Sequence, residues 1–416
     1  MKKSTLNNGI MIIFILILIT AKQLRFLPHL NILWNVPYIL MGGLLVSGFM
    51  FMAYKNKYNY LDIAVIIFNL FLIIPALLSE NKALFISIYI LPISGYYIFR
   101  TQIGNRINIF QLFLIASIII SMLTLSEFVS ENYLSSRWFD YESVNLEEIQ
   151  EGSIYGGNRY DKKFNPILGI IFGEYSILER PLGVAMSPQG SGALIAALAL
   201  FILSMRGHKH PIANNYKKLI RFAFIISLAA LIITLSGTGY IIFFVGSILI
   251  IVKGKKRIFL PFILPIILYL SLLIRGYGDQ LIRIIKYGHY LWGIFYNNLQ
   301  ENIVSWGIVF GGNQQMTLDI DYFNLLFRFG IIGVILIISI IFIVCKVFWP
   351  RLIKTSYCYK PLLPIMLAIL VANLHYDSIF RFPMSIMLFM ILGYISNQYS
   401  LIPAYLNIKN TKIKNV

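Results

Sequence analysis

Long apolar runs separated by short polar stretches occupy most of the 416 residues. A helix needs about 20 consecutive apolar residues to cross a bilayer. By that measure the pattern predicts twelve spans, at residues 9–24, 32–54, 61–79, 83–99, 107–125, 186–205, 219–236, 238–252, 258–274, 322–345, 361–376 and 382–398. We therefore expect an all-α fold, a polytopic transmembrane helix bundle of about 12 helices that forms a single integral membrane domain over residues 1–416.

The polar stretches between these spans alternate in charge. With the N-terminus in the cytosol, the inner stretches hold 22 of the 35 Lys and Arg residues and a single acid, Asp62. The other 16 of the 17 carboxylates fall in the outer stretches. Because Lys and Arg concentrate in the cytoplasmic loops of membrane proteins, the alternation predicts that both termini are cytoplasmic.

The composition excludes a water-soluble class and changes how the net charge is interpreted. Hydrophobic residues make up 58% of the chain and charged residues 12%, whereas soluble domains average about 25% charged residues. The formal charge of +18 lies mainly in short loops beside the spans, where it sets orientation, so we expect no nucleic-acid partner. Two cysteines, Cys345 and Cys358, cannot form a disulfide framework.

Two outer loops, at residues 126–185 and 275–321, are much longer than the rest. The first contains ten acids and five basic residues. In the second, polar side chains fall within a sector of roughly 80° on a helix, which predicts a helix lying along the membrane surface; they are Arg275, Asp279, Arg283, Lys286, Tyr290 and Asn297. Because most of the acidic residues of the chain lie in these two outer loops, we expect the protein to act at the outer face of the membrane.

Several arginines are candidates for binding an anionic substrate. Two or three guanidinium groups suit a pyrophosphate, because each binds phosphate oxygens with a planar pair of donors. Arg180 precedes a span, Arg283 shares the polar face of the surface helix, and Arg328 lies inside the tenth span. The alternative is that such arginines reach lipid headgroups or pair with the outer acids.

Asp319 and Asp321 stand at the edge of the tenth span and could supply a general base for a hydroxyl nucleophile. The alternative is a solvated turn. His289 and His375 can transfer protons or serve as interfacial residues, and no His, Cys, Asp or Glu cluster has the spacing of a zinc site. The chain has no Walker loop, dinucleotide fingerprint or serine nucleophile elbow, so we expect no cofactor.

Two glycine-rich stretches complete the set of unusual positions. Gly190-Ser191-Gly192 opens the sixth span, and Ser236-Gly237-Thr238-Gly239 joins the seventh and eighth. Small residues let helices approach closely. The alternative is a backbone that leaves room for a bulky lipid-linked substrate.

At these residues the chain resembles the O-antigen polymerase and ligase superfamily, the Wzy-type integral membrane glycosyltransferases. The similarity covers roughly residues 180–335, and the N-terminal half is similar in topology only. It is carried by the stretch Arg180 to Gly190, by Leu235 to Tyr240, and by a third region that runs from Arg283 through Trp292 and Gly311-Gly312 to the segment from Asp319 to Gly333.

The resemblance implies a GT-C-like fold with two large periplasmic loops in the bacterial inner membrane. It implies a polymerase that joins two oligosaccharides carried on undecaprenyl pyrophosphate, without a metal, with membrane lipid and a chain-length regulator as further partners. Arg180 and Arg283 would act on the pyrophosphate, and Asp319 or Asp321 on the acceptor hydroxyl. Further substrate-binding residues would be Arg159, Arg275, Lys286, His289, Tyr290, Tyr322 and Arg328.

Two other functions stay open. A ligase would move the finished glycan onto lipid A core, but Gly237 and Thr238 occupy the turn that often reads Ser-Arg in ligases, and Asp319 stands where ligases place a His. A flippase or secondary transporter would bury ionisable residues at mid-membrane, whereas the predicted spans hold almost none beyond Arg328.

The orientation can be tested by labelling single cysteines in a chain without Cys345 and Cys358. Cysteines placed in residues 126–185 or 275–321 should react with a membrane-impermeant maleimide added outside the cell. A cysteine at Lys255, in an inner stretch, should react only after permeabilisation. If the two long loops were reached only from the cytosol, the predicted orientation would be wrong.

Overall fold

The computed structural model describes residues 12–13, 15–20, 36–55, 58–101, 109–134, 181–185, 187–207, 216–234, 236–251, 292–293, 296–297, 306–312, 321–348, 365–366, 368–370 and 383–397. The regular elements in these residues are all helices. Five are long and apolar enough to cross a bilayer: Tyr60–Leu78, Lys82–Arg100, Ile109–Tyr133, Pro188–Met205 and Asn324–Val347. The chain is therefore a helical membrane protein, as the apolar pattern predicts.

Four further helices coincide with predicted spans: α2 (Val36–Lys55), α13 (Lys217–Thr234), α14 (Gly237–Ile251) and the helix Met384–Asn397. The predicted spans at 9–24 and 361–376 are described only in pieces, and the span at 258–274 lies outside the described residues. The total of twelve spans and the GT-C-like arrangement stay predictions.

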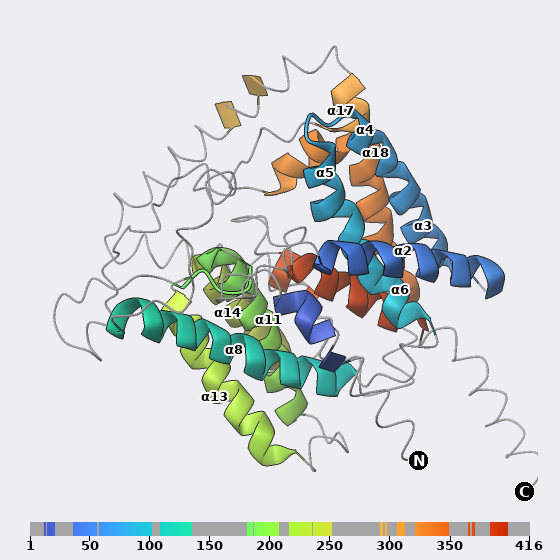
Figure 1. The fold of residues 1–416 in the computed structure, drawn as a ribbon. Coiled ribbons are helices and arrows are strands. Elements are labelled where there is room, and N and C mark those ends of the chain that lie inside the picture. The colour runs from blue at the N-terminus through green and yellow to red at the C-terminus, as the bar shows by residue number, and fades with distance from the viewer. Residues whose placement is uncertain are drawn as a thin grey trace, which may run out of the picture.

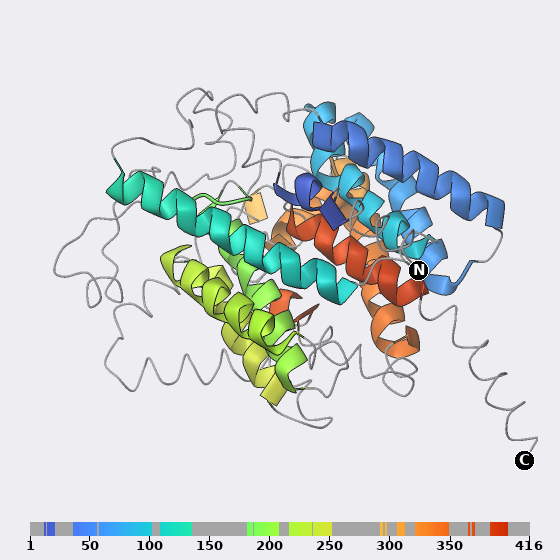
Figure 2. The same ribbon diagram turned by 60° about the horizontal axis from the view of Figure 1, so that its bottom comes forward.

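The described helices form two groups (Figures 1 and 2). The first contains α8 (Ile109–Tyr133), α11 (Pro188–Gly207), α13 and α14, with α11 packed against the other three. The second contains α2 and the helix Met384–Asn397, together with α3 (Tyr60–Phe71), α4 (Ile73–Leu78), α5 (Lys82–Phe85), α6 (Ser94–Arg100), α17 (Trp306–Phe310) and α18 (Asp321–Ile343).

Small residues and hydroxyl groups hold the first group together. A Cβ atom on Gly246 of α14 would lie 2.2 Å from the Cδ1 atom of Leu200 of α11, so a larger residue here would require the Leu200 side chain to move. Between α8 and α13, the Ser227 hydroxyl lies 2.7 Å from that of Ser117 and accepts a hydrogen bond of 3.2 Å from Ser121. Such bonds satisfy polar groups that lipid cannot solvate.

The second group packs around aromatic rings. Phe329 of α18 makes edge-to-face contacts with Phe68, Phe85 and Tyr89, at centroid distances of 6.0, 6.3 and 5.1 Å. The span Lys82–Arg100 is not a uniform α-helix, because a π-helix (Ile86–Ile90) and a 3-10 turn (Leu91–Ile93) separate α5 from α6. This irregular stretch contains Tyr89 and so places its ring beside α18.

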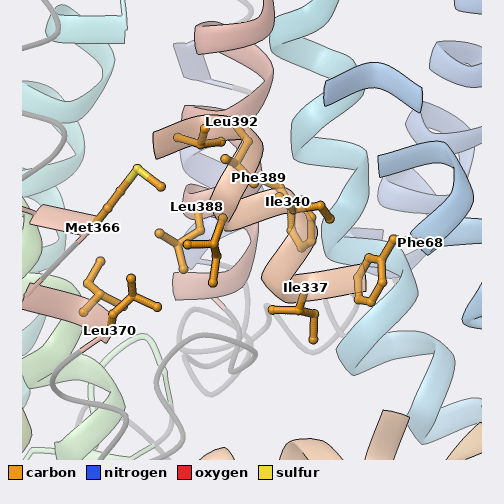
Figure 3. A pocket seen from close by; sticks show the side chains of 11 residues that line it. Phe68, Ile337, Ile340, Met366, Leu370, Leu388, Phe389 and Leu392 are labelled. Carbon is orange, nitrogen blue, oxygen red and sulfur yellow. The ribbon is translucent and has the colours of Figure 1, made fainter. Parts of the chain in front are cut away.

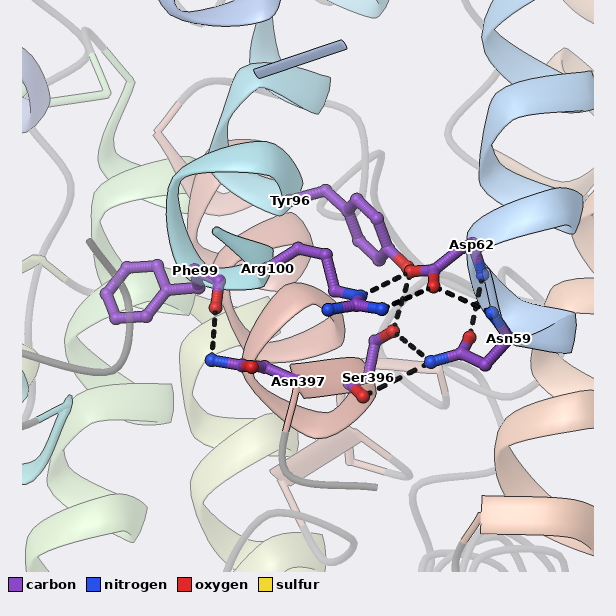
Figure 4. A network of polar contacts seen from close by, with 7 residues as sticks. All are labelled: Asn59, Asp62, Tyr96, Phe99, Arg100, Ser396 and Asn397. Atoms are coloured by element: carbon purple, nitrogen blue, oxygen red, sulfur yellow. Dashed lines mark hydrogen bonds and ion pairs between the residues drawn. The ribbon is translucent and has the colours of Figure 1, made fainter. Parts of the chain in front are cut away.

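A buried carboxylate joins three helix ends in the second group (Figure 4). Asp62, with no exposed surface, accepts two hydrogen bonds from the Arg100 guanidinium, of 2.7 and 2.8 Å. Tyr96 donates to the same carboxylate, as does Ser396 at 2.8 Å. The backbone N–H of Asn59 donates at 2.9 Å and completes a capping box at the start of α3.

The helix ends meet in two sets. One joins the start of α3, the end of α6 and the end of the helix Met384–Asn397, through Asp62, Arg100 and Ser396. The other joins the end of α8, the segment before α11 and the α13–α14 turn, through Glu127 and Ser236. Each set contains only ends that the predicted alternation assigns to one side. That the first set faces the cytosol stays a prediction.

Replacing Arg100 by Ala should destabilise the protein strongly. The change leaves the Asp62 carboxylate buried without its cation, and breaking a buried ion pair from one side costs about 3–5 kcal/mol. The measurement is the melting temperature of the purified protein in detergent. Arg221→Ala, which removes an exposed arginine from α13, should have little effect. Similar melting temperatures for both variants would show that the ion pair contributes no stability.

Candidate functional site

The described residues nearest to Arg180 in sequence are held at the end of α8. The Glu127 carboxylate, 1% exposed, accepts hydrogen bonds from two successive backbone N–H groups, Leu182 at 2.7 Å and Gly183 at 2.9 Å. Gly183 has a φ of 63°, and consecutive amides around such a left-handed residue can form a concave anion-binding surface. Glu127 therefore fixes the segment from Pro181 to Ala185 against the end of α8.

A second helix fixes the same segment from the other side. The Ser191 hydroxyl of α11 donates to the Leu182 carbonyl at 2.6 Å and accepts from the Ala185 N–H at 3.1 Å. A Cβ atom on Gly183 would lie 2.6 Å from this hydroxyl oxygen, so the close contact requires glycine. We call residues 181–185 the clamped segment; Glu127 and Ser191 are the two residues that hold it.

The start of α11 follows ordinary capping rules. Ser187 accepts from the Gly190 N–H at 3.0 Å through its hydroxyl, and Pro188 is the first helical residue. A serine N-cap followed by proline is a strong sequence signal for a helix start. The helix therefore begins at Pro188, three residues after Ala185.

The two glycine-rich stretches that stand out in the sequence meet at this point. Ser236 caps α14 by accepting from the Gly239 N–H at 2.9 Å, and its hydroxyl donates to the Gln189 carbonyl at 3.2 Å. A Cβ atom on Gly192 would lie 2.2 Å from the Ser236 side chain. The glycine therefore permits close packing here, which is the first of the two roles considered for it.

A second feature lies where α17 meets a break in α18. The helix is interrupted at Gly330, with φ 64° and ψ 178°. The turn after α17 packs on this break: the Gly312 N–H donates to the Arg328 carbonyl at 3.0 Å, and a Cβ atom on Gly311 would lie 2.3 Å from the same oxygen. Broken helices recur where membrane proteins bind ions and substrates.

Arg328 lies at this break and is 3% exposed. Its guanidinium carbon lies 5.7 Å from the centre of the Tyr89 ring, within the range of a cation–π interaction. The sequence marks Arg328 as a substrate-binding candidate. In the structure this side chain is buried and its charge lies against the Tyr89 ring.

An apolar cavity of about 90 Å³ lies between α3, α18, the helix Met384–Asn397 and the described helical residues 365–366 and 368–370 (Figure 3). Its lining is apolar throughout and includes Phe68, Ile337, Met366, Leu388 and Leu392. A cavity without polar groups does not bind ordered water and suits hydrocarbon.

Most of the predicted site residues lie outside the described residues: Arg159, Arg180, Arg275, Arg283, Lys286, His289, Tyr290 and Asp319. Asp321 and Tyr322 are the first two residues of α18, on the same helix as Arg328. The surface helix predicted in 275–321 is described only at 292–293, 296–297 and in α17. Within the described part of the chain, no three His, Cys, Asp or Glu residues lie together as a metal site.

Sequence reasoning missed the role of Glu127 because it ended the fifth span at residue 125 and assigned Glu127 and Glu131 to the loop. The structure continues α8 to Tyr133. A signal for this was present: Thr124, Glu127 and Glu131 follow at helical spacing and share a face. Mean hydropathy does not detect this continuation of the helix, because the two carboxylates lower the mean hydropathy of the segment.

In comparisons with known proteins, the chain matches no family model, no curated protein and no solved structure. The features that bear on function are therefore the chain's own: the stretches whose resemblance is described above, the clamped segment, the broken α18 and the distribution of charge.

Gly311→Ala should destabilise the junction between α17 and α18. The φ of 80° costs an alanine about 1–2 kcal/mol, and its Cβ would meet the Arg328 carbonyl oxygen. The expected result is a lower melting temperature in detergent. Gly43→Ala in α2 is the matched control, because its Cβ would meet no atom within 4 Å. Equal melting temperatures would mean that the turn does not pack on the break.

Proposed function

We propose that this chain is a polysaccharide polymerase of the bacterial inner membrane, a metal-independent glycosyltransferase that acts at the periplasmic face. Its donor is a growing glycan on undecaprenyl pyrophosphate, and its acceptor is a fresh repeat unit on the same lipid. The acceptor's sugar hydroxyl attacks the anomeric carbon of the donor, and the lipid pyrophosphate leaves.

The observation that carries this proposal is the fixed position of the segment that follows Arg180. Two backbone bonds to Glu127 and two to Ser191 hold it at the meeting point of α8, α11 and α14. An arginine directly before such an anchored stretch of backbone is suited to bind a pyrophosphate in a defined place. An arginine on an unanchored loop would contribute less, because binding would have to order it first.

In this proposal the arginines replace a metal ion. Arg180 and Arg283 neutralise the charge that develops on the leaving pyrophosphate, and such donors are most effective when they are fixed in advance. Asp319 or Asp321 orients or deprotonates the attacking hydroxyl. The carrier's hydrocarbon chain needs apolar surface, and the cavity beside α18 is apolar but, at about 90 Å³, has room for only a short part of such a chain.

The transporter alternative draws some support from the buried charges. Asp62, Glu127 and Arg328 are all at most 3% exposed, which is more ionisable burial than the sequence suggests. Asp62 and Glu127, however, lie near helix ends and accept several hydrogen bonds each. Proton or ion carriage needs groups that change partners near mid-membrane, so the polymerase remains the better reading.

In cells that make the glycan, Arg180→Ala and Arg283→Ala should each leave single repeat units and remove the long chains, at unchanged protein level. Removing one such donor typically lowers a catalytic rate by about 10²–10³. The measurement is the chain-length ladder of the extracted polysaccharide. Arg221→Ala, an exposed arginine on α13, should give a normal ladder. Normal ladders in both test variants would remove the pyrophosphate assignment.

A further inference from the structure

We propose that Glu127 is a positioning residue for the proposed transfer: it holds the backbone next to Arg180 in place without touching the substrate itself. The inference rests on the proposed function for its catalytic consequence. The clamp itself is a structural claim and can be tested separately.

The buried position of the Glu127 carboxylate destabilises the fold unless hydrogen bonds compensate for it. Burying an ionised carboxylate is unfavourable unless hydrogen bonds compensate for the lost water. Glu127 is 1% exposed, and its two oxygens each accept one backbone N–H, from Leu182 and Gly183. Bonds from backbone amides to an ionised carboxylate are stronger than those to a neutral acceptor. The negative charge of Glu127 therefore strengthens the two hydrogen bonds that hold the clamped segment.

The geometry of the segment transmits this constraint toward Arg180. Leu182 is held through its N–H by Glu127 and through its carbonyl by Ser191, so both sides of one residue are fixed. Pro181, next to it and buried, has a φ fixed by its ring. A proline also restricts the backbone of the residue before it. Few rotatable bonds thus separate the anchored carbonyl of Leu182 from residue 180.

Glu127→Gln is the informative substitution. Glutamine keeps the shape of the side chain, but only its carbonyl oxygen can accept, so one of the two amides loses its partner. The segment should open more often while the helices stay packed. A displacement of about 1 Å in a catalytic group can cost about 10² in rate, so kcat should fall about tenfold or more at an unchanged melting temperature.

The clamp is tested first by labelling. In a chain without Cys345 and Cys358, Leu182→Cys places a thiol at a buried position of the segment, 6% exposed in the native residue. A maleimide then reacts only when the segment opens. Adding Glu127→Gln should raise the labelling rate about tenfold or more. Glu80→Gln, which removes an exposed carboxylate far from the segment in sequence, should leave the rate unchanged.

The second measurement is polymerisation by the same purified proteins in lipid vesicles, with the lipid-pyrophosphate repeat unit extracted from the host. Faster labelling in Glu127→Gln with lower kcat supports the positioning role. Unchanged labelling overturns the clamp, whatever the activity. Faster labelling with kcat unchanged overturns the positioning role and leaves a structural clamp. If the unsubstituted protein makes no polymer while its labelling still responds to Glu127→Gln, the proposed function fails and the clamp stands.

Discussion

Lipid offers no hydrogen bonds, so every polar group at the level of the bilayer needs a partner inside the protein. In the part of this chain that the structure describes, two buried carboxylates near helix ends meet the requirement with bonds to more than one element. Asp62 accepts bonds from Arg100, Tyr96, Ser396 and a backbone amide, and in doing so joins the ends of three helices. Glu127 does the same for the clamped segment at the other set of ends. These two junctions therefore fix which helix ends lie together.

The two junctions differ in what they hold. Asp62 bonds mainly to side chains on helices, those of Arg100, Tyr96 and Ser396, and its charge is balanced by Arg100, so the arrangement suits a permanent structural contact. At Glu127 the partners are backbone amides of a non-helical segment, so the carboxylate orders a piece of chain that has no helix of its own. Irregular backbone at a membrane edge is where substrate-binding residues are commonly found. This contrast is the reason that the proposed chemistry is assigned to the end where Glu127 lies.

At the break in α18, glycines rather than a carboxylate hold two elements together. Gly311 and Gly330 both adopt positive φ and pack backbone against backbone, so the break is an ordered contact with α17. The break carries Arg328 and follows Asp321 and Tyr322 on the same helix. Its position thus places three of the predicted site residues on one helix.

The apolar pattern and the composition by themselves determined the class of this protein and the position of most of the described helices. These features are local, because a helix start or an apolar run depends on neighbours a few residues away. The tertiary structure decided that Asp62 pairs with Arg100 and Ser396, that Glu127 holds Leu182, and that Gly192 faces Ser236. Such pairings join residues 38 to 334 positions apart for Asp62 alone. Hydropathy reports how well a segment suits lipid, but it contains no information about which helix ends meet.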